Sequence, residues 1–219
     1  MKKQIIFFLG LTMLTAMVAV VYASEKGSYS DSLSGSMNND TKGSVNSLHH
    51  MATAQIKGTQ PGSDISGSAE FTETQNGLRV HAHIQGVSGS GKHGFHIHEN
   101  GSCDNSGKAA GGHYNPKEVK HGYLPDDGLK GAHAGDMGNI VIDQKGEGKL
   151  TVDLPGLSLL GKNNVLGRAV ILHEKEDDFG QPTGNAGSRI GCGVIEAVAM
   201  SMTTESQEPK GSMQNKGSY

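Results

Sequence analysis

The chain has no tryptophan and few other aromatic residues, with five phenylalanines and five tyrosines among 219 residues. It also lacks a basic excess, because 19 lysines and arginines stand against 22 aspartates and glutamates, for a formal net charge of −3. Nucleic-acid-binding domains usually carry a strong basic excess, so the charge gives no support for such a partner. Few stretches of the central region have the apolar period of about 3.6 residues that marks an amphipathic helix, which argues against a helical domain.

The first 23 residues have the order of a secretory signal peptide. A short basic start, Met1–Gln4, precedes the mostly apolar run Ile5–Val21, and the small residue Ala23 stands at the exit. This order predicts cleavage after Ala23 and an exported chain, either periplasmic or secreted. The apolar run is longer than a typical signal core, so an uncleaved anchor is the alternative, and only then would the membrane be a partner.

Polar segments on either side bound the part of the chain that can fold. Residues 24–50 are rich in Ser, Gly, Asn and Asp, and residues 201–219 are similarly polar. Such segments bury too little apolar surface to offset the entropy of ordering, so we expect a disordered linker and a disordered tail. The remaining residues, 51–200, match one domain of about 150 residues.

Only two cysteines are present, Cys103 and Cys192, and both lie inside the predicted domain. In an exported chain they are expected to pair as one structural disulfide, with two buried free thiols as the alternative. The bridge would close a long loop and stabilise the fold by about 3–5 kcal/mol in the chain-entropy model. Because Cys103 stands close to a run of histidines, the bridge would also fix a loop beside them.

Short alternating segments separated by turn residues predict an all-β domain, an antiparallel sandwich or barrel. Two long irregular stretches, Glu99–Gly138 and Glu174–Gly191, interrupt the pattern. Long loops in a compact domain need another source of order and are usually functional. The expected strands are residues 52–58, 66–72, 78–84, 94–98, 139–143, 149–154, 169–173 and 193–199.

Six of the eleven histidines and one aspartate form a pattern typical of metal ligands. Two of the histidines are two residues apart on an expected strand, so their imidazoles reach the same face. Three more lie in the first long stretch with the aspartate, and one ends an apolar strand. Neutral imidazoles suit copper and zinc, and a carboxylate adds a harder, charged ligand. The seven residues are His96, His98, His113, His121, His133, Asp136 and His173.

The other five histidines have simpler interpretations. His81 and His83 share one face of an expected strand, far in sequence from the long stretches, and surface exposure is expected for both. His49 and His50 lie in the linker, where at most adventitious metal contact is expected. His93 stands beside the strand pair and is expected to be hydrogen-bonded near the metal site.

Five segments together make the central region resemble one family across nearly its whole length. They are residues 94–99 (Gly-Phe-His-Ile-His-Glu), 111–116 (Gly-Gly-His-Tyr-Asn-Pro), 133–139 (His-Ala-Gly-Asp-Met-Gly-Asn), 170–174 (Val-Ile-Leu-His-Glu) and 184–193 (Gly-Asn-Ala-Gly-Ser-Arg-Ile-Gly-Cys-Gly). This combination resembles the copper/zinc superoxide dismutases. The resemblance implies a Greek-key, immunoglobulin-like β-sandwich or barrel with two long functional loops.

The resemblance also implies a chemistry and a role for each site residue. Two superoxide anions and two protons would become dioxygen and hydrogen peroxide as copper cycles between two oxidation states, with zinc in a structural role. His113 would bridge the two metals, Arg189 would attract and orient the anion, and Thr183 would line the channel. Asp177 would link a histidine of each metal site. The implied copper ligands are His96, His98, His113 and His173, and the implied zinc ligands are His113, His121, His133 and Asp136.

Some features depart from a single branch of that family. Residues 99–103 look like bacterial members, residues 173–178 look more like eukaryotic ones, and the loop from Glu174 to Thr183 is shorter than usual in eukaryotes. The resemblance is not extended to a dimer interface, and the chain is expected to be either a monomer or a homodimer. A non-catalytic copper or zinc buffer, a copper-delivery module and an adhesive domain carried on the linker are the alternative functions. The presence of all seven ligands together with Arg189 favours catalysis.

Overall fold

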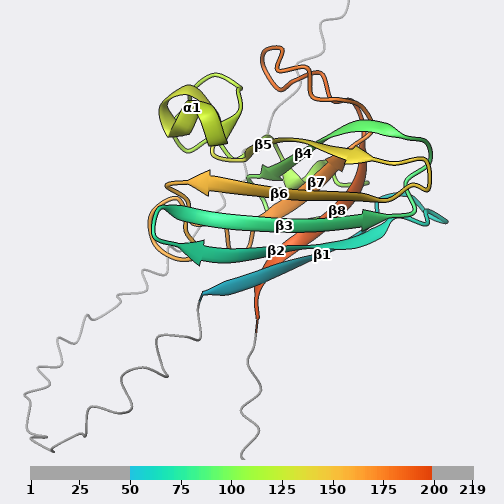
Figure 1. The fold of residues 1–219 in the computed structure, drawn as a ribbon, viewed down its shortest axis with the longest axis horizontal. Coiled ribbons are helices and arrows are strands. Elements are labelled where there is room, and N and C mark those ends of the chain that lie inside the picture. The colour runs from blue at the N-terminus through green and yellow to red at the C-terminus, as the bar shows by residue number, and fades with distance from the viewer. Residues whose placement is uncertain (1–49, 199–219) are drawn as a thin grey trace, which may run out of the picture. The chain divides into compact units, whose positions relative to one another are not determined.

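A computed structural model of the chain describes residues 50–198 (Figure 1). The predicted signal peptide, His49 and the rest of the linker before residue 50, and the predicted tail lie outside the described residues. No helix among residues 50–198 is long and apolar enough to cross a membrane.

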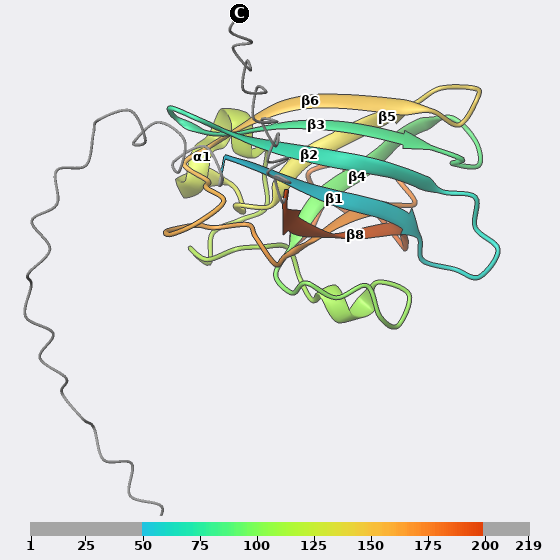
Figure 2. The same cartoon turned by 90° about the horizontal axis from the view of Figure 1, so that it is seen from below.

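Eight antiparallel strands close into a barrel in the order β1-β2-β3-β6-β5-β4-β7-β8 (Figures 1 and 2). Because β3 is followed in space by β6 and β4 by β7, the chain crosses over twice, as the predicted Greek-key arrangement requires. All eight expected strands are confirmed, with ends that differ by a few residues. Their bounds are β1 Met51–Gly58, β2 Ser66–Thr74, β3 Gly77–Gln85, β4 Gly91–His98, β5 Asp136–Ile142, β6 Gly148–Pro155, β7 Ala169–His173 and β8 Arg189–Ala197.

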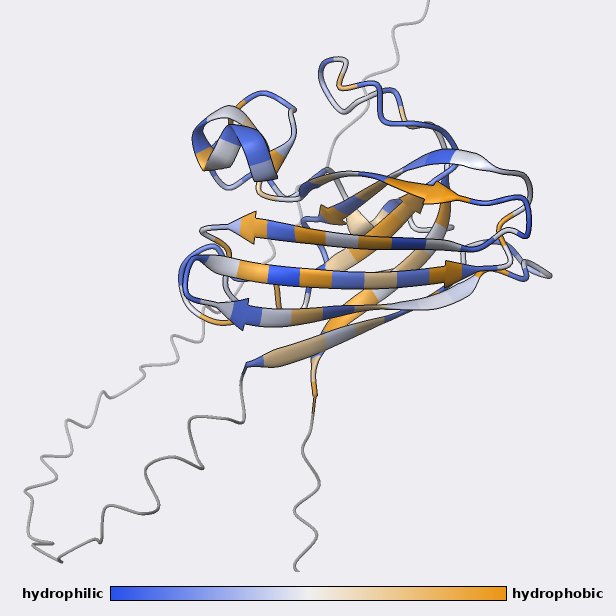
Figure 3. Cartoon of the chain, viewed as in Figure 1, coloured by the Kyte–Doolittle hydropathy of each residue, from blue (hydrophilic) through white to orange (hydrophobic). Residues whose placement is uncertain are grey.

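On one side of the barrel, buried and exposed side chains alternate along the strands, as in a sheet with one solvent-exposed face. In β3 every second residue from Leu78 to Ile84 is buried, and the intervening ones from Arg79 to Gln85 are exposed. Figure 3 shows the same alternation of hydropathy along β3 and β6. The inward side chains of all eight strands fill the barrel with a core rich in Ile, Leu, Val and Ala and including Phe71 and Phe95.

Strands β4 and β7 depart from this alternation. The last six residues of β4 and all five residues of β7 are buried. Phe95 and Ile97 belong to the barrel core, so the alternate residues His96 and His98 project from the outer face of β4. They are buried because the long loops cover that face, and this arrangement positions the candidate site.

The first long stretch is less irregular than expected. It contains a short 3-10 helix, Lys108–Ala110, and the α-helix α1, Leu124–Gly131, which lies outside the barrel wall beside β5 and β6 (Figure 1). Pro125 stands in the first turn of α1, where its missing N–H costs nothing. Gly128 interrupts the helix with a φ of 61°. A helix of eight residues with a break inside it shows no usable period, which is why the sequence did not predict it.

The predicted disulfide is confirmed between Cys103 and Cys192, which are 89 residues apart. It joins the first long loop to β8. The part of the loop just after Cys103 is thereby held against the barrel, with the Gly107 N–H donating to the carbonyl of Cys103 (3.0 Å).

Candidate metal centre

The seven residues expected to bind metal come together in the structure. Each is buried, and none has more than 7% of its surface exposed. Strand β4 supplies two histidines, β7 one, β5 the aspartate at its first residue, and the first long loop three histidines. Their ligand atoms form two groups, and the atoms of each group lie within 4.8 Å of one another.

The first group consists of four histidines, namely His96, His98, His113 and His173. Nε2 of His98 lies 3.3 Å from Nε2 of His173, and the ring centroids of His96 and His113 are 4.2 Å apart. Strands β4 and β7 are neighbours in the barrel, so the sheet itself brings three of these side chains together. Four imidazoles around one point are ligands that suit copper.

The second group consists of three histidines and a carboxylate. Oδ1 of Asp136 lies 2.8 Å from Nδ1 of His113 and 3.2 Å from Nδ1 of His133. Its other oxygen, Oδ2, lies 2.9 Å from Nδ1 of His121. Backbone N–H groups of Gly122 and His133 also donate to Oδ2, at 3.0 and 2.9 Å, and hold the carboxylate in place. Three nitrogens and one oxygen form a ligand set that suits tetrahedral zinc.

His113 is the one residue common to both groups. A bridge between the backbones of His98 and His113 holds the first loop against the end of β4. Nδ1 of His113 faces Asp136 of the second group, so Nε2 is the nitrogen left for the four-histidine group. An imidazole has one nitrogen on each side of its ring, and His113 can therefore serve two ions at once.

Two buried nitrogens test whether these groups fit metal ions. Among the described residues, Nδ1 of His96 and Nδ1 of His121 are buried without a hydrogen-bond partner. The latter is close to Oδ2 of Asp136 but lacks the alignment of a hydrogen bond. Leaving a buried polar atom unpaired costs about 1–3 kcal/mol. Each nitrogen belongs to one of the two groups, so a metal ion in each group would satisfy both.

Asp177 connects the two groups. Its Oδ2 accepts a hydrogen bond from Nε2 of His96 (2.8 Å), and its Oδ1 accepts one from Nε2 of His121 (2.9 Å). The Asp177 carboxylate is fully buried. The side-chain amide of Asn139 donates to the Asp177 carbonyl at 2.9 Å and accepts its N–H at 2.8 Å. Asn139 ends one of the family-like segments, but the sequence did not indicate this contact with a residue of the second loop.

Burial and charge give the histidines different proton affinities in the protein without metals. Burial lowers the pKa of His113 to about 4 and the pKa of His173 to about 3, and it holds the pKa of His98 well below its usual value. These imidazoles are therefore neutral at pH 7, the form that binds metal. Burial would also lower the pKa of His121, but the carboxylates of Asp136 and Asp177 outweigh it and raise this pKa to about 9.

The carboxylates of Asp136 and Asp177 stay ionised because neighbouring imidazoles outweigh the effect of burial. Burial would raise the pKa of Asp136, but close contacts with the imidazoles of His113, His121 and His133 hold it far below its usual value. Burial acts the same way on Asp177, and hydrogen bonds from His121 and His96 again keep its pKa low. The two carboxylates therefore carry two negative charges, which the proton on His121 offsets in part and bound cations would offset further.

A cavity of about 350 Å³ opens onto the four-histidine group. Its walls include His98, His113 and His173 as well as Thr183 and Arg189, the two residues expected to serve an anion. The half-buried guanidinium of Arg189 donates to the carbonyl oxygens of Gly107 and Gly111. Burial lowers the pKa of Arg189, but an arginine remains charged at any physiological pH. The cavity thus has metal ligands on one side and a fixed positive charge on another.

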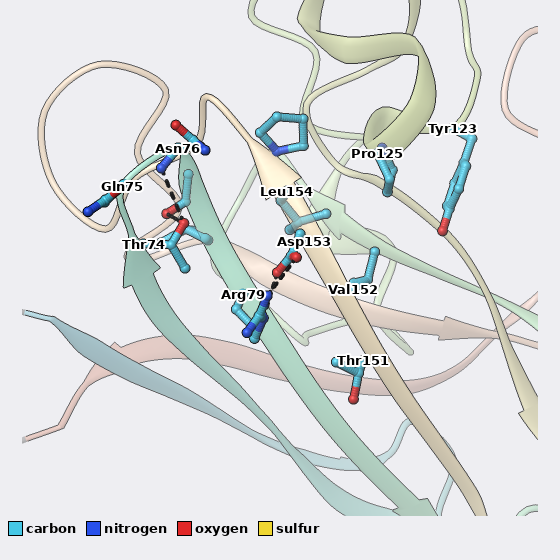
Figure 4. A pocket seen from close by; sticks show the side chains of 13 residues that line it. Thr74, Gln75, Asn76, Arg79, Tyr123, Pro125, Thr151, Val152, Asp153 and Leu154 are labelled. Atoms are coloured by element: carbon cyan, nitrogen blue, oxygen red, sulfur yellow. Dashed lines mark hydrogen bonds and ion pairs between the residues drawn. The ribbon is translucent and has the colours of Figure 1, made fainter.

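A second cavity, of about 610 Å³, lies elsewhere on the barrel (Figure 4). It is lined by the β2–β3 turn, by β6, by Pro125 in the first turn of α1 and by Tyr123 just before that helix. An exposed ion pair between Arg79 and Asp153 is part of its lining, with Nε 2.7 Å from Oδ1. None of the seven candidate ligands lines this cavity, so its volume does not mark the reactive centre.

The other histidines lie where expected, within the described residues. His93 is buried, and its Nδ1 donates to the carbonyl of His173 at 2.9 Å, so it supports a candidate ligand. His81 and His83 are exposed on the outer face of β3. His50 is also exposed, with Nδ1 3.5 Å from Glu73. None of these residues joins either group.

The fold and the site define a class of protein: a closed antiparallel barrel with two adjacent groups of potential metal ligands on its outer face. Comparison with known proteins identifies the family. The sequence profile of copper/zinc superoxide dismutase matches residues 65–195. The chain belongs to this family, whose cofactors are copper and zinc.

Individual relatives agree with this assignment. The chain is 40% identical over 156 residues to the extracellular Cu-Zn superoxide dismutase of Caenorhabditis elegans, covering 67% of this chain and 69% of that protein. It is 42% identical over 140 residues to the extracellular enzyme of Drosophila melanogaster, covering 60% and 75%. Among solved structures, the crystal structure of the clock protein EA4 aligns with a TM-score of 0.61 and 35% identity, covering 69% of this chain and 96% of that one.

Proposed function

We propose that the two groups bind one copper and one zinc ion, and that the domain converts two superoxide anions and two protons to dioxygen and hydrogen peroxide. The observation that carries the proposal is that His113 belongs to both ligand groups. The four histidines hold copper, because imidazole nitrogens suit copper and this group contains no carboxylate. The group that contains Asp136 holds zinc.

Copper supplies the chemistry when bound, because it can accept an electron from one superoxide and give an electron to the next, whereas zinc is redox-inert. The chain has to supply the protons and a binding site for the anion. Formation of hydrogen peroxide consumes two protons, and Nε2 of His113, beside the cavity, could hold one of them only while it is not bound to copper. His113 is thus both a metal ligand and a catalytic residue.

The substrate is a small anion, and the chain offers a cation to receive it. Arg189 lines the same cavity as His98, His113 and His173. Its guanidinium is held by two backbone carbonyls, so its charge has a fixed position. A positive charge in a cleft raises the encounter rate of an anion in a salt-dependent way. Thr183 lines the same channel and can donate its hydroxyl to the anion.

Asp177 serves both metal sites without binding either ion. Its two oxygens accept the Nε2 protons of His96 and His121, which leaves Nδ1 of each ring for a metal. A carboxylate behind a ligand histidine fixes its tautomer and its orientation.

The proposal places the enzyme outside the cytoplasm. The relatives in Caenorhabditis elegans and Drosophila melanogaster are named extracellular enzymes, and residues 1–23 have the order of a signal peptide. The confirmed disulfide suits an oxidising compartment. We propose secretion or export to a periplasm of domain 51–200, with polar segments 24–50 and 201–219 as its linker and tail. It acts as a monomer or homodimer and contacts a membrane only if the signal segment is retained.

Superoxide consumption and metal content measured on one preparation test this function. The protein is stripped of metal and reloaded with copper and zinc together, or with zinc alone. We expect one ion of each metal per chain and rapid catalysis only in the protein with both, because zinc alone cannot transfer an electron. A fully loaded protein that leaves superoxide unchanged would instead be a metal buffer or a delivery module.

A further inference from the structure

Three alternate residues of the second long loop, Asp177, Phe179 and Gln181, all contact one histidine of the first loop. That residue is His121, which is only 4% exposed and belongs to the carboxylate-containing group. Asp177 binds the edge of its ring, as described above. The contacts made by Phe179 and Gln181 are of a different kind, and neither residue belongs to a ligand group.

Gln181 binds the backbone of His121 at both of its polar groups. The side-chain amide donates from Nε2 to the carbonyl of His121 at 2.9 Å, and its Oε1 accepts the His121 N–H at 3.1 Å. Two bonds to a single residue fix both its position and the orientation of its peptide planes. The residues are 60 positions apart, so this pair ties the second loop to the first.

Phe179 covers the ring of the same histidine. The two rings are stacked, with centroids 6.2 Å apart and planes inclined by 19°. The Phe179 N–H donates to Oδ1 of Asp177 at 2.8 Å, and Tyr123 packs edge-on against the Phe179 ring at 6.1 Å. Phe179 has a φ of 60°, an uncommon conformation for a residue other than glycine. The local backbone is therefore held in a specific form that directs this ring onto His121.

From these contacts we infer that Gln181 and Phe179 are positioning residues that hold His121 in the zinc group and slow the release of zinc. This inference rests on the proposed function for the identity of the ion. Asp177, Phe179 and Gln181 contact His121 and none of the other three members of that group, so His121 is the member that the second loop holds. Gln181 contacts no member of the four-histidine group, and copper release should not depend on it.

Release of each metal from the fully loaded protein to a coloured chelator tests this inference. Gln181→Met keeps the length of the side chain and removes both hydrogen bonds, and Gln181 is exposed, so no cavity forms. We expect zinc to leave about tenfold faster, as two lost hydrogen bonds of ordinary strength allow, and copper to leave at the wild-type rate. Gln85→Met is the matched control, because Gln85 is an exposed glutamine at the end of β3 whose side chain donates to Ser66 of β2 and, within residues 50–198, has no hydrogen bond to either ligand group.

Two further variants separate positioning from general loosening of the fold. Gln181→Glu keeps an acceptor for the His121 N–H and loses the donor, so we expect an intermediate rate of zinc release. Phe179→Leu should accelerate zinc release less than Phe179→Ala. Cobalt bound in place of zinc should show an altered absorption spectrum in Gln181→Met and an unaltered one in Gln85→Met.

The outcomes distinguish this inference from the proposed function. Wild-type zinc release from Gln181→Met would overturn the inference, and so would an equal acceleration of copper and zinc with a lower unfolding temperature. Both results leave the catalytic proposal intact. A wild-type protein that binds no zinc would overturn the proposed function and this inference together.

Discussion

Nε2 of His98 lies 3.3 Å from Nε2 of His173, across two neighbouring strands of the barrel. Burial keeps the pKa of both imidazoles below 6.5, so at pH 7 neither ring carries a charge that would repel the other. Two nitrogens bound to one ion at about 2.0–2.1 Å lie about 3 Å apart. Neighbouring strands therefore hold these two members of the four-histidine group near a binding geometry, whereas three of the four members of the other group lie in the first loop.

The first prediction concerns guidance of the anion. Arg189→Ile should lower the rate of superoxide consumption severalfold or more at low ionic strength, because the fixed positive charge beside the copper group is lost. Both metals should stay bound. Arg79→Ile removes an arginine from an exposed ion pair beside the other cavity and should leave the rate unchanged. An Arg189→Ile rate equal to that of the wild type would exclude the guidance role.

The second prediction concerns the close approach of Gly184 to the link between the metal groups. A side chain at this position would collide with the carboxylate of Asp177 and come near Nε2 of His121. Gly184 has a φ of 76° and Gly161 a φ of 87°, so alanine at either position costs about 1 kcal/mol or more in backbone strain. Gly161 has nothing near its added carbon. Only Gly184→Ala should weaken metal binding, as measured by competition with chelators.

Equal metal affinities of the Gly184→Ala and Gly161→Ala proteins would mean that the Asp177 link can shift without cost. We expect instead that Gly184→Ala weakens zinc about tenfold or more, the usual range when the partner of a ligand histidine is disturbed.

The third prediction is a pH dependence of zinc binding. His121 has a pKa of about 9 in the metal-free protein, so at pH 7 it carries a proton that must leave before Nδ1 can bind an ion. Protons compete with zinc below that pKa, and zinc affinity should therefore rise as the pH increases, by about tenfold per unit between pH 7 and 8 and less near pH 9. Isothermal titration calorimetry of zinc binding at pH 7, 8 and 9 measures this affinity. A zinc affinity that stays constant from pH 7 to 9 would contradict the raised pKa.

The fourth prediction concerns the disulfide. Replacing Cys103 and Cys192 with serine should lower the free energy of unfolding by about 3–5 kcal/mol, since the bridge closes a long loop. Denaturant unfolding with and without the bridge measures the loss. Activity should fall as well, because the loop after Cys103 carries Gly107, whose carbonyl holds the Arg189 guanidinium. Full activity in a destabilised variant would show that the bridge acts on stability alone.

The strands of the barrel were predictable because their side chains alternate. Strand β3 has an apolar side chain at every second position from Leu78 to Ile84, and the turn residues Gln75 and Asn76 stand before it. The helix α1 was not predictable, because it has only eight residues, one buried side chain and a break at Gly128. A helix this short and irregular does not produce a periodic pattern of apolar residues that could be recognised in the sequence.

The candidate ligands were predictable because residue type alone restricts them. Histidines two apart on a strand, and a histidine-rich loop that ends in an aspartate, leave few other interpretations. The contacts of Phe179 and Gln181 with His121 were not predictable. They join residues about 60 positions apart, and they depend on a loop conformation that includes a positive φ at Phe179. No local pattern of residues encodes such a contact.

The sharing of one imidazole between two ions is tested most directly by the copper and zinc dissociation constants of three variants. His98→Ala should weaken copper alone, and His133→Ala should weaken zinc alone, because each residue belongs to one group. His113→Ala should weaken both metals, each by more than about a hundredfold, since a lost ligand costs more than a lost partner of a ligand. If His113→Ala weakens only one metal, or neither, the two groups do not share His113 and the account is wrong.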